Sequence, residues 1–164
     1  MTDTPPGLAV APAPPDFAEW ETLLALLRRA FAYMEGRVDP PSSLTRMDAA
    51  ALRDKAGAEA LLLAHDATGG LVGCLFAADR GDALHIGKLA VEPARQGERI
   101  GAALMAAAEA LARGRGLPAL ELETRVELTG NHRAFARMGF EKVGESAHAG
   151  YDRPTSFTFR RALD

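Results

Sequence analysis

The stretch that decides the fold is Lys88-Leu89-Ala90-Val91-Glu92-Pro93-Ala94-Arg95-Gln96-Gly97-Glu98-Arg99-Ile100-Gly101-Ala102-Ala103-Leu104. It begins as an apolar strand, passes through a short loop with glycine, and continues as a helix. The N-terminus of a helix carries unpaired N–H groups and a partial positive charge, and glycine lets the backbone approach an anion closely. The segment therefore suits a pyrophosphate, although such glycines also occur in strand-to-helix turns for packing alone.

Two helices and a run of strands precede this segment. Asp16, followed by Glu19, has the spacing of a capping box, and apolar residues then repeat at helical spacing as far as Gly36. A shorter Ala-rich helix is expected over residues 45–56, stopped by Gly57. Three apolar or alternating runs, separated by turn sequences, predict an antiparallel meander at residues 59–65, 71–79 and 83–91.

The remaining elements follow the central segment. The helix that begins near Ile100 should end in the cations and glycines of residues 113–116, and a strand should begin at residues 120–122. Asn131 can cap a further helix that ends at Gly139, and short strands are expected at residues 140–145 and 156–160. At the start of the chain, one edge strand is expected at residues 8–10, after which prolines exclude regular structure.

Composition limits the function classes. The chain has 164 residues, 48% of them hydrophobic and 25% charged, and a net charge of −3. Five prolines within residues 1–15 predict a Pro-rich lead-in, and the length and composition predict one globular domain over residues 16–164. The charges are interspersed, so neither a nucleic-acid nor a membrane partner is expected. The lead-in lacks the basic and apolar parts of a signal peptide, and Cys74 has no partner cysteine, so a cytoplasmic location is expected.

Several segments resemble the GNAT superfamily of acetyl-CoA-dependent N-acetyltransferases. The family signature is Gln or Arg, two residues, Gly, one residue, then Gly or Ala, and Gln96 and Gly101 match its two ends. Residues 89–93 resemble the family's fourth strand, and residues 131–140 resemble its fourth helix. The resemblance runs from Asp16 to Arg160 and implies a mixed α+β fold, a mostly antiparallel twisted sheet of six or seven strands flanked by about four helices.

The resemblance also implies how acetyl-CoA is held. Strands four and five splay apart, and the pantetheine arm pairs with the exposed edge of strand four. The main chain of Leu89, Ala90 and Val91 would contact pantetheine. The amides that would bind the pyrophosphate are those of Gln96, Gly97, Glu98, Arg99, Ile100, Gly101 and Ala102. Asn131 either bonds pantetheine or only caps its helix. No metal is implied.

Two residues depart from the family pattern. Arg99 stands where the signature has its middle glycine. The arginine restricts the backbone there and would add a guanidinium near the phosphates; alternatively, it is a solvated residue of the first turn whose side chain has no role. Phe135 stands where many members carry a tyrosine that protonates the leaving thiolate. Phenylalanine donates no proton, so it either packs against pantetheine or is a core aromatic.

The acid and base must then come from elsewhere. His85 lies where some relatives place a base, and strand alternation puts it on one face with Gly87 and Leu89, although a lone strand histidine is more often structural. The carboxylates of Glu92, Glu121 and Glu123 are its rivals. Tyr151, in a polar loop between the last two strands, is the candidate acid, or else part of a surface turn. The Pro-rich loop at residues 39–43 is a second candidate wall of the acceptor site.

The sequence thus favours an N-acetyltransferase in which a primary amine attacks acetyl-CoA directly. An unpaired cysteine in a strand is usually a small core residue, so Cys74 does not indicate a covalent intermediate. The alternative is a non-catalytic acyl-CoA-binding or regulatory module, which the changes at Arg99 and Phe135 would permit. A dinucleotide-binding fold is disfavoured because a hairpin, and not a crossover helix, precedes the glycine loop. The expected acceptor is a small-molecule or peptide amine, and a homodimer is left open.

Overall fold

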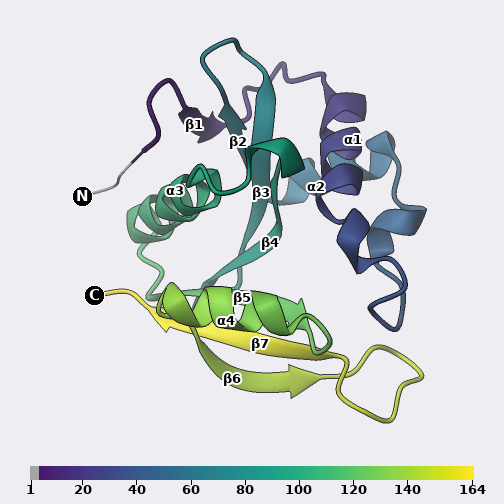
Figure 1. Ribbon diagram of the computed structural model, residues 1–164. Coiled ribbons are helices and arrows are strands. Elements are labelled where there is room, and N and C mark those ends of the chain that lie inside the picture. The colour runs from purple at the N-terminus through teal and green to yellow at the C-terminus, as the bar shows by residue number, and fades with distance from the viewer. Residues whose placement is uncertain (1–3) are drawn as a thin grey trace.

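A computed structural model describes residues 4–164 and shows one seven-stranded sheet in the order β1-β2-β3-β4-β5-β7-β6, with helices on both faces (Figure 1). The strands are β1 (Ala9–Pro12), β2 (Ala60–His65), β3 (Leu71–Asp79), β4 (Leu84–Val91), β5 (Ala119–Arg125), β6 (Glu141–Ser146) and β7 (Ser156–Ala162). The α-helices are α1 (Trp20–Ala30), α2 (Ala49–Ala58), α3 (Ile100–Gly114) and α4 (Thr129–Arg137). The fold predicted from the sequence is confirmed.

Strand pairing divides the sheet into two halves. β1 to β4 pair antiparallel in sequence order, and β5, β7 and β6 form a second antiparallel group. The two groups meet only where β4 and β5 run parallel, with Leu84 opposite Leu120 and Ile86 opposite Leu122. Figure 1 shows the second group turned away from the first below this junction.

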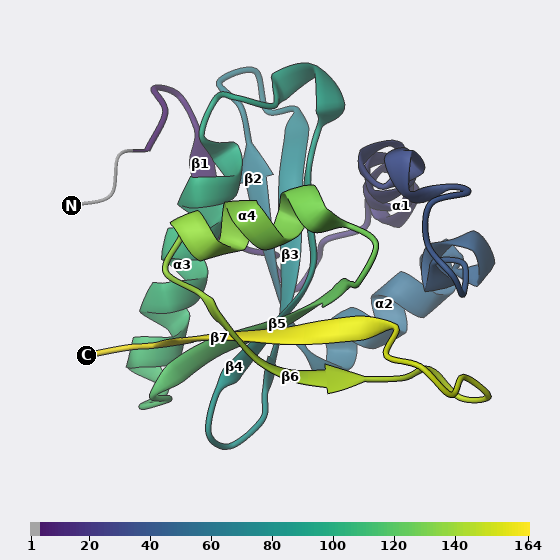
Figure 2. The ribbon, with the colours of Figure 1, turned by 60° about the horizontal axis from the view of Figure 1, so that its bottom comes forward.

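The helices form two separate cores with the sheet. α3 and α4 pack on one face together with apolar residues such as Leu104 and Leu120, whereas α1 and α2 cover the other face around Leu27 and Phe76 (Figures 1 and 2). The apolar repeat of α1 explains its placement, because its leucines at helical spacing are almost completely buried. The two cores pack against opposite faces of the sheet, and the junction between β4 and β5 lies between them.

The ends of the first two helices differ from the sequence prediction. α1 begins at Trp20, no side chain caps it, and its predicted last turns form a separate 3₁₀ segment, Ala32–Met34. Asp16 therefore does not cap the helix. α2 begins at Ala49, where Asp48 Oδ1 accepts a hydrogen bond of 2.8 Å from the Ala51 N–H. Gly57 lies within α2 and does not end it, since packing outweighs its weak helix propensity.

Two further boundaries need correction. β1 extends to Pro12, so the expectation that this proline excludes regular structure is wrong. An edge strand tolerates proline because its outer N–H groups need no partner. α4 begins at Thr129 with Leu128 at the capping position, so Asn131 lies inside the helix and does not cap it. Its side chain is therefore available for a contact elsewhere.

Two further observations concern residues 4–164. None of their helices combines the length and apolar character needed to cross a bilayer. Within the same residues, no group of three or more His, Cys, Asp or Glu side chains is arranged to hold a metal ion.

Candidate active site

The candidate active site is a cleft at the junction of β4 and β5. Their pairing stops at Ile86 and Leu122, although β4 continues to Val91 and β5 to Arg125. The two edges therefore separate, and a cavity of about 820 Å³ opens between them. Its walls come from β4, β5, α4, the segment that follows α1, and the loop between β6 and β7. An unpaired strand edge of this kind can bind an extended, amide-containing ligand.

A β-bulge in β4 shapes the cleft. Gly87 lies opposite Phe76 and Ala90 opposite Cys74, so Lys88 and Leu89 together face a single residue of β3. Lys88 has φ +50°, a conformation that costs energy for a residue with a Cβ. The bulge interrupts the alternation predicted from His85 through Leu89, and the Leu89 side chain packs with the core on the α3 side.

The predicted pyrophosphate loop joins β4 to α3. A 3₁₀ turn at Pro93–Arg95 leads to Gln96, and Gly97 then has φ +86°. Arg99 occupies the N-cap of α3 in the left-handed conformation, with φ 68° and ψ 20°. The family signature has glycine at this position, which is the residue that adopts this conformation at least cost. Arg99 therefore adopts a backbone conformation that favours glycine.

Substitutions at Arg99 should separate backbone strain from the role of the side chain. Arg99→Gly and Arg99→Ala both remove the guanidinium, but only glycine adopts the left-handed conformation without strain. We expect the glycine variant to be more stable than the alanine variant by about 1 kcal/mol. Urea unfolding of the two variants measures this difference. Equal stabilities would mean that α3 begins with another backbone geometry.

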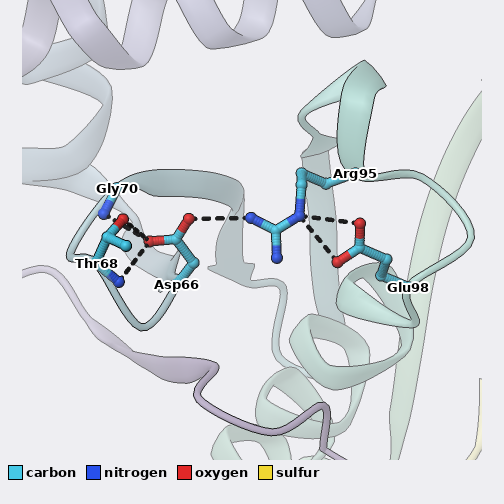
Figure 3. A network of polar contacts seen from close by, with 5 residues as sticks. All are labelled: Asp66, Thr68, Gly70, Arg95 and Glu98. Atoms are coloured by element: carbon cyan, nitrogen blue, oxygen red, sulfur yellow. Dashed lines mark hydrogen bonds and ion pairs between the residues drawn. The ribbon is translucent and has the colours of Figure 1, made fainter.

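A network of charged side chains supports this loop from the β2–β3 turn (Figure 3). Arg95 lies at its centre, with Nε 2.9 Å from Glu98 Oε1 and a terminal nitrogen 3.0 Å from Asp66 Oδ2. Asp66 Oδ1 accepts hydrogen bonds from the Thr68 hydroxyl and from the Thr68 and Gly70 amides. The pKa of Asp66 falls to about 2, chiefly because of the Thr68 hydroxyl and the Gly70 amide.

Asp66→Asn tests this support. The folded-state pKa of Asp66 lies below its unfolded value, so the carboxylate stabilises the fold above about pH 4 and loses this effect as the pH falls towards about 2. We expect Asp66→Asn to lower the melting temperature at pH 7, with a difference from the parent that narrows over this acid range. Asp79→Asn is the control, because Asp79 bonds the Gly81 amide in a similar turn but lies outside the network. If both variants behave alike, the link to Arg95 contributes nothing.

The structure brings some of the predicted cofactor residues to the cavity wall. Leu89, Asn131 and Phe135 line it. The Ala90 side chain is buried in the α1–α2 core, and the Val91 side chain faces Gly101 at the start of α3. Gln96, Gly97, Glu98, Arg99, Ile100, Gly101 and Ala102 form the loop and first turn beyond the end of β4 and do not line the cavity itself.

Asn131 and Phe135 point from α4 towards different partners. Asn131 Nδ2 lies 3.1 Å from the Tyr33 hydroxyl oxygen and donates a hydrogen bond to it. Phe135 packs against Phe140 and Phe159 in the α3-side core, with ring centroids 6.0 and 6.4 Å away. Phe135 is thus a core aromatic that also forms part of the cleft wall.

Tyr151 lines the cleft from the loop between β6 and β7. Its hydroxyl donates a hydrogen bond of 2.6 Å to Asp39 Oδ1, and Arg153 binds Asp39 Oδ2 at 2.8 Å. The hydrogen bond to the Asp39 carboxylate raises the pKa of Tyr151 and keeps the phenol protonated. Arg125 holds the same wall by donating to the carbonyls of Pro40 and Pro41. The two loops suggested as acceptor walls therefore meet at Asp39.

His85 lies outside the residues that line the cleft. Its Nδ1 is 3.1 Å from Glu121 Oε1, in the part of the sheet where β4 and β5 still pair. Glu92 forms an ion pair with Arg29 of α1. Of the three carboxylates considered as rivals, Glu123 alone lines the cavity.

Sequence reasoning missed Tyr33, whose hydroxyl also reaches the cleft. Tyr33 was included in the first helix, but α1 ends at Ala30 and the 3₁₀ segment turns this side chain to the cavity wall, where it is 41% exposed. No local pattern in the sequence marks this position, because the end of α1 at Ala30 and the contact between Tyr33 and Asn131 depend on tertiary packing. Lys88 was also missed, because a bulge leaves no clear mark in a sequence of this kind.

Cys74 is a core residue, as the sequence indicated. It is completely buried, its Sγ contacts the Lys88 carbonyl oxygen at 3.6 Å, and burial raises its pKa to about 12. A thiol in this state is not a nucleophile at neutral pH.

The structure has two features that the sequence resemblance implied: a β4–β5 junction that splays apart, and a loop that leads from β4 into the N-terminus of α3. Residues 20–140 match the model of the acetyltransferase (GNAT) family. The chain belongs to this family and is an acetyltransferase. A comparison with curated protein sequences finds no match.

Several solved structures share this fold. PaiA N-acetyltransferase from Thermoplasma acidophilum, in complex with coenzyme A, has a TM-score of 0.76 with 13% identity, over 95% of this chain and 99% of that one. A GNAT family acetyltransferase from Elizabethkingia anophelis, with acetyl-CoA bound, has a TM-score of 0.68 with 16% identity, over 96% and 99%. Nourseothricin acetyltransferase is 25% identical, with a TM-score of 0.58, over 64% of this chain; the chain spans 65% of that protein.

Proposed function

We propose that this protein transfers an acetyl group from acetyl-CoA to a primary amine by direct attack. The observation that carries the proposal is the unpaired edge of β4 from Gly87 to Val91, which opens on the cleft and runs into the loop before α3. The edge offers backbone groups to the amides of pantetheine, and the start of α3 offers N–H groups to the pyrophosphate. The relatives that hold coenzyme A or acetyl-CoA share this fold, which supports the choice of donor.

The residues of this chain fit such a donor. Leu89, Ala90 and Val91 would bind pantetheine through their main chain, while the amides of residues 96–102 would face the pyrophosphate. An added Cβ at Gly101 has one neighbour within 4 Å, a Val91 methyl at 3.7 Å, so the backbone at this point of α3 is open to a ligand. Phe135 and Asn131 would face the same arm from α4. When bound, acetyl-CoA supplies the activated acetyl group.

The amine would approach from the end of the cleft that is closed by the loop at residues 39–43 and by the Tyr151 loop. Direct attack fits the inert state of Cys74. Tyr151 is proposed as the acid that protonates the leaving thiolate, because it lines the cleft and its pKa is raised. Tyr33 is a second phenol on the cleft wall. The role of His85 as base stays a prediction, since its imidazole bonds Glu121 outside the cleft lining and would need a water to reach the amine.

Release of free CoA from acetyl-CoA tests this function. The purified protein is mixed with acetyl-CoA and a panel of primary amines, amino acids and peptides, and free thiol is measured together with the mass of the acetylated product. We expect rapid release with a subset of the panel. Slow release with every amine, alongside good CoA binding, would instead favour the non-catalytic acyl-CoA-binding module. The cytoplasmic location and a homodimer remain predictions that this experiment does not address.

A further inference from the structure

The charge on the cleft wall is unbalanced. Neither the Arg46 nor the Lys88 side chain has a hydrogen-bond or ion-pair partner among residues 4–164, but Arg46 is exposed whereas Lys88 is half-buried. The charged Lys, Arg, Asp and Glu side chains that line the cleft are Arg46, Lys55, Lys88, Glu123 and Arg125, four cations against one carboxylate. Arg125 is occupied by the carbonyls of Pro40 and Pro41, and Lys55 forms an ion pair with Glu59 at 2.7 Å. The ammonium of Lys88 makes neither a hydrogen bond nor an ion pair with any other residue in the range 4–164.

The backbone conformation and the partial burial of Lys88 both cost free energy, which a bound anion could offset. The residue is half-buried at the bulge of β4 and has φ +50°. Burial, and next the charge of Lys55, lower its pKa below the ordinary value. A strained backbone and a poorly solvated cation both cost stability, and such costs gather at ligand-binding sites.

The location of Lys88 separates it from the pyrophosphate. The loop at residues 96–102 lies beyond the C-terminal end of β4, whereas Lys88 lies in the middle of the strand and lines the cavity together with Arg46 and Lys55. These two cations come from the segments between α1 and β2, which include the loop at residues 39–43 that is proposed above as a wall of the acceptor site. An anion bound at Lys88 would thus belong to the acceptor and not to the phosphates of CoA.

Resting on the function proposed above, we infer that Lys88 binds an anionic group of the acceptor, so that the substrate is a small amine that carries a carboxylate or a phosphate. Arg46 adds positive potential on the same side of the cleft, whereas the charge of Lys55 is paired with Glu59. A single ammonium recognises carboxylate and phosphate alike as a point charge, so the shared feature is the negative charge.

Matched pairs of amines test this inference. Amino acids are compared with their primary amides, and phosphoethanolamine with ethanolamine, at constant ionic strength and with CoA present. The rise in melting temperature gives binding, and CoA release from acetyl-CoA gives kcat/KM. We expect kcat/KM for at least one anionic member to be about tenfold or more above that of its neutral partner. A preference within the amino acid pairs would indicate a carboxylate, and a preference for phosphoethanolamine over ethanolamine would indicate a phosphate.

Variants assign the preference to Lys88. Lys88→Met should remove the preference for the anionic member of each pair. Because it changes only the side chain and retains the main chain proposed to bind pantetheine, the melting shift by CoA alone should stay close to that of the parent. Lys88→Arg should keep most of the preference. Lys142→Met is the control, because Lys142 lies on β6 outside the cleft lining and pairs with Glu145. Lys88→Met should also melt at a higher temperature than the parent at pH 7, since it removes an unpaired, half-buried charge. This melting curve shows that the variant is folded.

Three results would overturn the inference. The first is no preference for the anionic member of any pair, and the second is a preference that persists in Lys88→Met. The third is an equal loss of kcat/KM for anionic and neutral members in Lys88→Met, which would place Lys88 at the reacting amine or at CoA. The two proposals can fail separately. Binding of anions that depends on Lys88, without acetylation of any amine, would refute only the acetyl transfer. Rapid acetylation of neutral amines that does not depend on Lys88 would refute only this inference.

Discussion

Gly101→Trp is expected to abolish the rise in melting temperature that CoA gives to the parent protein. A ligand that binds only the folded state stabilises it by about 2.7 kcal/mol at a concentration 100 times its Kd, which corresponds to several degrees for a chain of this size. Gly101 lies in the first turn of α3, where its missing side chain leaves the backbone open beside Val91. An indole there would fill the space through which a pyrophosphate must approach the N–H groups.

The matched control for this prediction is Gly114→Trp. Gly114 ends the same helix, and an added Cβ there meets nothing within 4 Å, so the variant carries the same bulk far from the loop. We expect it to fold and to retain the CoA shift. If millimolar CoA fails to shift even the parent, the cofactor proposal is wrong. If Gly101→Trp binds CoA as the parent does, the pyrophosphate lies elsewhere.

The fold could be read from the sequence because its strands and helices carry strong local patterns. The predicted bounds of β3 agree with the structure, since a long apolar run lies between two clear turn sequences. The ends of helices were harder to predict. Asp16 and Glu19 have the spacing of a capping box, yet α1 begins only at Trp20 because tertiary packing of its apolar face decides where the helix forms.

The site was predictable only in part, for a physical reason. The loop at residues 96–102 follows from a local motif that resembles the family signature. In contrast, the direction in which the Lys88 side chain points depends on the bulge in β4. The hydrogen bond between Tyr151 and Asp39 joins residues far apart in the chain. Such long-range geometry depends on how the two halves of the sheet meet, which no local pattern records. Tyr33 was missed for a related reason, because the helix ends before it.

Tyr151→Phe is expected to lower kcat about 100-fold while acetyl-CoA binding stays nearly unchanged, because only protonation of the leaving thiolate is lost. The variant retains the aromatic ring on the cleft wall but breaks the hydrogen bond to Asp39. Tyr33→Phe is the matched control, since it removes the other phenol that lines the cleft. We expect it to cost at most a few-fold in kcat. Steady-state kinetics with an acceptor found in the amine panel gives both values.

Asp39→Asn tests whether the charge of Asp39 affects proton transfer by Tyr151 separately from its hydrogen bond, which holds the Tyr151 loop against residues 39–43. Its amide oxygen can still accept the Tyr151 hydrogen bond, but the negative charge that raises the pKa of Tyr151 is gone. The folded-state pKa of Tyr151 should therefore fall towards the ordinary value for tyrosine. If Tyr151 is the acid, the variant retains its rate at pH 7, and its rate declines at a lower alkaline pH than that of the parent. An unmoved alkaline limb, together with parental rates for Tyr151→Phe, would mean that the proton reaches the thiolate through water or from the substrate. A larger loss in Tyr33→Phe than in Tyr151→Phe would assign the proton to Tyr33.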